Sequence, residues 1–201
     1  MQQNAPDLLV GVADWLPEDF AVATLEVLEE AGATASVHRY SMGPYAGVEL
    51  YLRTAVGIFI AAGFFNGFLA KAGEDAYEKL KAAARSLFRK SAAVGIKIVG
   101  SQGKLREKRF SGTFAISCAL LPNLRVKLLV GQDQTIDEIE TGINLFFDLM
   151  RDIQLDRLGR EELERLFRHG AVGGTALMTF DATLGCVVAV DGPVEARDAK
   201  D

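Results

Sequence analysis

Hydrophobic and polar positions change their spacing several times along the chain, and these changes mark out the expected elements. Residues 8–14 form a short apolar run of strand length, and Pro17 then opens a pattern with apolar positions three or four apart up to Gly32. Small and β-branched residues follow at 33–40. We therefore expect a strand, a helix and a second strand over 8–40, joined by a parallel, right-handed crossover.

The central stretch from Thr54 to Ala70 has 17 residues without a charge and decides between two kinds of protein. As a helix it would span roughly 25 Å, which is short of the roughly 30 Å hydrocarbon core of a membrane. β-Branched residues alternate over 54–61, as in a strand covered on both faces, and a helical pattern runs from Phe64 to about Lys90. The sequence thus predicts a buried strand that leads into a long amphipathic helix.

The remaining chain alternates between strand and helix patterns. We expect strands at 47–53, 92–100, 110–121 and 124–131, a long amphipathic helix that begins at a Thr135–Glu138 capping box, a short helix at 160–169, and a closing hairpin formed by 175–181 and 186–191. The predicted fold class is mixed α/β (α+β), with a β-α-β-β start, a central amphipathic helix, an antiparallel meander, a second long helix and a C-terminal hairpin. We expect one domain over 1–191, with a possible subdivision near 91–93, and a polar tail at 192–201.

Composition fits a folded chain, and the distribution of charge adds a second feature. The 201 residues are 49% hydrophobic, which is enough to build a core, and the net charge is -5. Residues 1–80 carry 4 basic and 11 acidic side chains, residues 81–127 carry 11 and 1, and residues 128–201 carry 7 and 15. The basic middle could face an anionic partner or pair with the acidic ends of the same chain. The acidic balance of the whole chain favours internal pairing.

Basic side chains within that middle segment are the candidates for contact with an anion: Lys97, Lys104, Arg106, Lys108, Arg109, Arg125 and Lys127. Only Phe110 lies near them in the sequence to stack on a base, so we do not expect nucleic-acid binding. A second candidate surface is aromatic and consists of Phe59, Phe64, Phe65 and Phe68. It could contact a partner protein, or a membrane if the segment were released.

The residues that often carry catalysis are few and far apart. Two histidines, His38 and His169, and two cysteines, Cys118 and Cys186, lack the spacing of a metal site. The two cysteines could pair, but we expect both thiols to be free and buried. His169 is expected at the end of a helix, and a His169–Cys186 pair would need the fold to bring the two together. Acidic pairs such as Asp148 and Asp152 are expected on exposed helical faces. We assign no catalytic residue, metal or cofactor.

These patterns lead to one functional hypothesis and two alternatives. The first is a non-catalytic intracellular module that docks another protein, associates with itself or regulates a partner. The alternatives are a protein that binds membranes or anionic lipids conditionally, and an enzyme whose site is assembled from scattered residues. Residues 1–6 lack the basic and apolar regions of a secretory signal, so we expect a cytoplasmic protein.

Overall fold

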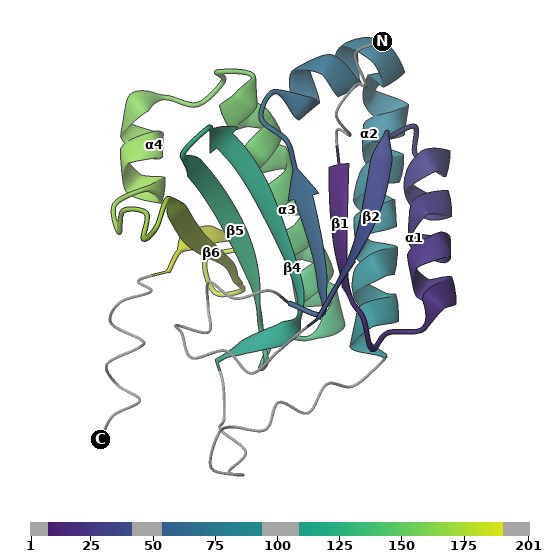
Figure 1. Ribbon diagram of the computed structural model, residues 1–201. Coiled ribbons are helices and arrows are strands. Elements are labelled where there is room, and N and C mark those ends of the chain that lie inside the picture. The colour runs from purple at the N-terminus through teal and green to yellow at the C-terminus, as the bar shows by residue number, and fades with distance from the viewer. Residues whose placement is uncertain (1–7, 42–53, 94–108, 191–201) are drawn as a thin grey trace, which may run out of the picture.

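Seven strands form one mixed sheet in the computed structural model, which describes residues 8–41, 54–93 and 109–190 (Figure 1). In chain order the elements are β1 (Leu8–Ala13), α1 (Glu18–Glu30), β2 (Ala35–Tyr40), β3 (Val56–Ile60), α2 (Phe64–Ala92), β4 (Phe110–Leu121), β5 (Leu124–Gly131), α3 (Ile136–Gln154), α4 (Arg160–Leu166), β6 (Thr175–Asp181) and β7 (Cys186–Ala189). The mixed α/β fold class and the C-terminal hairpin are confirmed.

The sheet has the strand order β2-β1-β3-β4-β5-β6-β7. Parallel neighbours are β1 with β2, β3 with β4, and β5 with β6, and each of these pairs is linked through at least one helix. The other neighbours, including the β4–β5 and β6–β7 pairs, are antiparallel. The chain therefore repeats a strand–helix–strand crossover three times along one sheet.

The third crossover has the opposite hand to the first two. β5 runs antiparallel to β4 and therefore also to β3. The chain nevertheless moves in the same direction across the sheet when it passes from β3 to β4 and from β5 to β6. The two connecting helices, α2 and α3, pack side by side on the same face. In Figure 1, β1–α1–β2 is right-handed, as predicted, β3–α2–β4 is right-handed as well, and β5–α3–β6 is left-handed. Right-handed crossovers make up about 98% of known cases, so the third one is unusual.

Alternate strand positions on the helix side build the main core. One row across the sheet consists of Val10, Ile58, Ile116, Leu128 and Met178, each 3% exposed or less. The apolar stripes of α2 and α3 cover this row with residues such as Leu80, Leu87, Ile143 and Phe146. The period-2 pattern of the strands and the 3.6-residue pattern of the helices thus meet at a single interface.

In the described part of the chain β3 is fully covered on one side only, which differs from the prediction that both of its faces are covered. Val56, Ile58 and Ile60 are buried under the helices, whereas Gly57 and Phe59 on the other side are only partly buried. α1, α2 and α3 all lie behind the sheet in Figure 1. The opposite side, to which Phe59 points, is called the outer face below.

Most predicted helix limits agree with the structure, with two differences. α2 contains a kink at Gly73, whose φ of 78° is outside the helical region, and α4 ends at Leu166, so His169 lies beyond the helix. At Thr135 both hydrogen bonds of the capping box are present. The expected strand at 47–53 lies outside the described residues, as do residues 94–100 of the expected strand at 92–100, and Ala92 closes α2 instead of opening that strand.

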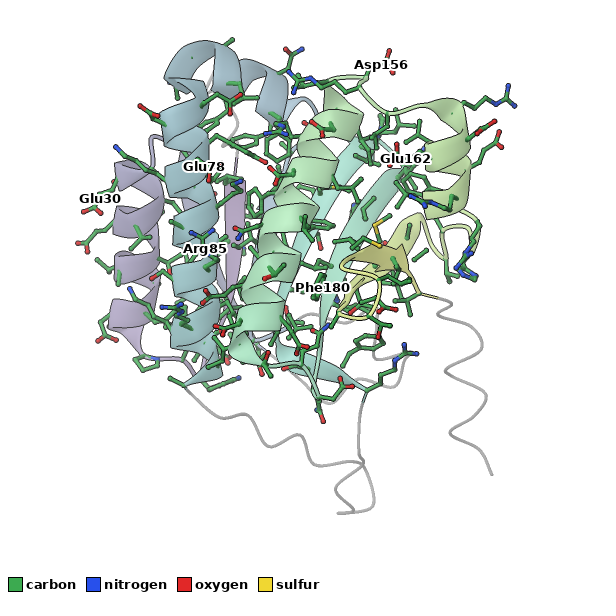
Figure 2. The ribbon with its side chains drawn as sticks, turned by 180° about the vertical axis from the view of Figure 1, so that it is seen from behind. Glu30, Glu78, Arg85, Asp156, Glu162 and Phe180 are labelled. Carbon is green, nitrogen blue, oxygen red and sulfur yellow. The ribbon has the colours of Figure 1, made fainter. Side chains whose placement is uncertain are left out.

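α3 lies very close to the sheet at Gly142. A Cβ atom at this position would lie 2.7 Å from the Cβ of Phe180 on β6, so no larger residue fits unless one element moves. Figure 2, which views the molecule from the helix side, shows Phe180 beside α3. Gly67 in α2 offers a matched comparison, because a Cβ there would meet nothing within 4 Å.

We predict that Gly142→Ala lowers the free energy of unfolding by about 1–3 kcal/mol, because the new methyl group overlaps with Phe180. Gly67→Ala should raise it by up to about 1 kcal/mol, since alanine favours the helix. Urea denaturation followed by circular dichroism measures both. Equal effects of the two substitutions would contradict the close packing of α3 on β6.

Candidate functional site

Of the seven predicted anion-binding residues the structure describes three, Arg109, Arg125 and Lys127, and it does not bring these three into one cluster. Lys97, Lys104, Arg106 and Lys108 lie outside the described residues. Arg109 precedes β4, where its guanidinium lies 5.2 Å from the ring centroid of Phe110. Arg125 lies on β5 opposite Ala119, ten residues further along β4, which corresponds to about 33 Å of extended chain. Arg109 and Arg125 therefore lie near opposite ends of the β4 and β5 strands.

Arg125 forms a defined contact with Phe59 on the outer face. The guanidinium carbon of Arg125 lies 5.7 Å from the centroid of the Phe59 ring, two strands away on β3. The side chain can cross β4 because this strand presents the small residues Ser117 and Ala119 there. Leu9 on β1 flanks Phe59 from the other side and is 38% exposed.

We call this surface the Arg125 patch; it consists of Leu9, Phe59, Ser117, Ala119 and Arg125. It lies where β3 and β4 end and where β1 and β5 begin. Every one of its side chains is partly or fully exposed. A neighbouring part of the outer face differs, because Phe110, Leu129, Leu177 and Val190 form a buried apolar cluster of their own. The patch is thus the accessible end of a face that is covered elsewhere.

Lys127, two residues after Arg125, belongs to the covered part. It is only 7% exposed, and burial lowers the pKa of its amine from 10.5 to about 8. The amine thus has the charge of an ordinary lysine at neutral pH but bears a desolvation cost. Its depth makes it a poor first contact for an external anion.

The predicted aromatic surface is divided by the fold. Phe64, Phe65 and Phe68 are at most 6% exposed and belong to the main core, where the rings of Phe64 and Phe68 stack 5.0 Å apart. Only Phe59 reaches the outer face. A contact with a partner or a membrane through the other three rings would require the core to open.

A polar seam between α2 and α3 was not predicted from the sequence. It joins Tyr77, Lys81, Arg85 and Arg89 of α2 to Asp148, Asn144 and Glu140 of α3. Both sets repeat every four residues, which places each on one face of its helix. That shared spacing was the available signal, and Figure 2 shows Arg85 on α2 at this junction.

Asp148 is the centre of this seam. Its Oδ1 accepts a hydrogen bond from the Tyr77 hydroxyl at 2.8 Å and lies 3.3 Å from the Lys81 amine and 3.5 Å from an Arg151 nitrogen. The two cations also lie 4.9 and 5.0 Å from the Tyr77 ring centroid. The sequence led us to expect Asp148 on an exposed helical face, whereas in the structure it contacts side chains of both α2 and α3.

The seam shows how part of the basic middle segment is neutralised. Lys81 and Arg89 form ion pairs with Asp148 and Glu140 of α3, which belongs to the acidic last third of the chain, whereas Arg85 donates a hydrogen bond to the uncharged amide of Asn144. Burial and the hydrogen bond to Asp148 raise the pKa of the Tyr77 hydroxyl above its usual value. The phenol thus stays protonated at neutral pH, and the group is suited to holding two helices together.

The residues considered for catalysis are not assembled in the described part of the chain. Cys118 is buried, and burial raises the pKa of its thiol to about 12, while Cys186 is exposed, so the prediction that both thiols are buried is wrong for Cys186. His169 is exposed after α4, and no described contact joins it to Cys186. His38 is exposed on β2.

Within the described residues, His, Cys, Asp and Glu nowhere form a group of three or more that could hold a metal ion. The helices of the described residues also include none with the length and apolar composition needed to cross a membrane. Comparison of the chain with protein-family models, curated proteins and solved structures gives no match.

We predict that Tyr77→Phe lowers the free energy of unfolding by about 1–2 kcal/mol, because it removes a hydrogen bond to a carboxylate at a buried site. Arg160→Ala is the control, since it breaks an exposed pair with Glu164 and should cost less than about 0.5 kcal/mol. Chemical denaturation of both variants measures the difference. Equal costs would show that the seam contributes no more than a surface ion pair.

A second prediction concerns pH. The folded-state pKa of Lys127 is about 8 and lies below the ordinary value of 10.5, so folding favours the neutral amine. The contribution of Lys127 to stability should therefore increase as the pH rises from about 8 to about 10.5. Lys127→Met should remove this increase, because methionine carries no amine that titrates.

Arg125→Met is the matched control for this measurement, because arginine does not titrate in that range. Thermal or urea unfolding from pH 7 to 10.5 provides the comparison. A parallel pH dependence of the wild-type protein and Lys127→Met would contradict the lowered pKa.

Proposed function

We propose that the protein is a non-catalytic interaction module that docks a partner protein on the Arg125 patch. The observation that carries the proposal is the stacking of an exposed arginine on a partly exposed phenylalanine beside Leu9. Arginine and aromatic residues are enriched among the side chains that dominate binding energy at protein interfaces. Exposed apolar side chains gathered on one surface also favour an interaction site.

The surroundings of the patch support the same function. Leu121, at the end of β4 two residues beyond Ala119, is 59% exposed, so a further apolar side chain is accessible at this end of the sheet. The small side chains of Ser117 and Ala119 allow the Arg125 side chain to lie across β4, so that its guanidinium and the Phe59 ring form the centre of the patch. The regulatory role and the cytoplasmic location expected from the sequence remain predictions.

Site-specific photocrosslinking in cells tests the docking surface. A benzophenone amino acid in place of Phe59 should form defined protein adducts, which mass spectrometry can identify. The same amino acid in place of Val22, which is 58% exposed on α1, serves as the control. Identical adducts at both positions, or none at position 59, would contradict the proposal.

A binding measurement with the crosslinked partner then gives the magnitude. Leu9→Ser combined with Phe59→Ser should weaken binding at least tenfold, because the apolar contact area is lost. Val22→Ser should leave binding unchanged. If the adduct is a second copy of this chain, sedimentation of the same variants distinguishes self-association from docking of another protein.

A further inference from the structure

Arg125 is the exposed cation of the patch, and its side chain has no ion-pair partner among the described residues. It is more than a flexible surface arginine, because the Phe59 ring supports the guanidinium at 5.7 Å. Stacking on an aromatic ring leaves the in-plane N–H donors available. The strand below it is fixed as well, since the backbone N–H of Arg125 donates to the carbonyl of Gly174 at 2.8 Å.

From this geometry we infer that the Arg125 patch recognises a carboxylate on the docked partner, carried by an extended segment with apolar residues on both sides of the acidic one. The inference rests on the proposed function and names the chemistry of the partner. A planar guanidinium binds a carboxylate through two parallel hydrogen bonds. Leu9 and Phe59 then offer apolar contacts to the flanking side chains.

The charge of the site fits one carboxylate better than a polyanion. Nucleic acids and anionic membranes gain affinity from several exposed cations acting together. Among the described residues of the patch Arg125 is the single cation, and Lys127 next to it is 7% exposed. Arg109 lies at the far end of β4. A single negative charge on the partner therefore matches the single accessible positive charge.

The dimensions of the patch fit a short extended segment. It covers the four neighbouring strands β1, β3, β4 and β5, and three strand separations of about 4.8 Å correspond to roughly 14 Å. Four or five extended residues span this distance. One acidic residue near the middle of such a segment can reach Arg125, with an apolar neighbour towards Leu9.

Nuclear magnetic resonance titration of the full chain with two defined peptides tests the inference. The probes are acetyl-Val-Leu-Glu-Leu-Val-amide and the same peptide with glutamine in place of glutamate. The glutamate peptide should bind with millimolar affinity and shift the signals of Leu9, Phe59, Ser117 and the Arg125 side chain. The glutamine peptide should bind about tenfold more weakly, since it lacks the charge-assisted hydrogen bonds.

Variants and competing anions complete the test. Arg125→Met should abolish the difference in affinity between the two peptides, and Arg125→Lys should retain only part of this difference. In both variants the peptides should still shift the signals of residues in the Arg125 patch. Equal binding of both peptides, shifts elsewhere, or binding of inorganic phosphate or phosphatidylserine vesicles in preference to the glutamate peptide would overturn the inference.

Failure of this inference is distinguishable from failure of the proposed function. A partner that crosslinks at position 59 and binds Arg125→Met as well as it binds the wild-type protein would preserve docking and exclude carboxylate recognition. Loss of binding by at least fivefold in Arg125→Met, with Arg125→Lys intermediate, is the result expected if the partner carries the carboxylate.

Discussion

The structure depends on the placement of α1, α2 and α3 on one face of the sheet, and the left-handed β5–α3–β6 crossover makes this possible. After the β4–β5 hairpin has reversed the strand direction, a right-handed crossover to β6 would place α3 on the outer face. The left-handed path instead puts α3 beside α2. There it closes the core with Ile143 and Phe146 and allows the seam centred on Asp148 to form.

This arrangement also explains why the protein has an accessible sheet surface. Residues on alternate positions of β1, β3, β4 and β5 point away from the three helices, and the Arg125 patch is the exposed end of that face. Ser117 and Ala119 let the Arg125 side chain reach the Phe59 ring across β4. Core formation and the proposed docking surface are thus two results of the same layer arrangement, because every strand has two faces and only one is packed against α1, α2 and α3.

Sequence reasoning located single candidates of the site but not their association. Arg125 and Phe59 were both singled out, yet they belonged to different predicted sets, one basic and one aromatic. Their contact depends on β3, β4 and β5 being neighbours in the sheet, and the spacing of residues along the sequence does not reveal the order of the strands. The seam was missed for a related reason. The four-residue spacing of Tyr77, Lys81, Arg85 and Arg89 was visible, but only the packing of α3 against α2 supplies Asp148 as a partner.

The sequence by itself determined the elements: period-2 runs marked the strands, three- and four-residue spacing marked α2 and α3, and the Thr135–Glu138 capping box marked where α3 begins. These features depend on neighbours within a few residues, so local physics suffices. Tertiary structure alone decided the hand of the third crossover, the burial of Phe64, Phe65 and Phe68, and the exposure of Phe59. Each depends on which segments, distant in the chain, lie against each other, because an apolar residue is buried only where another element covers it.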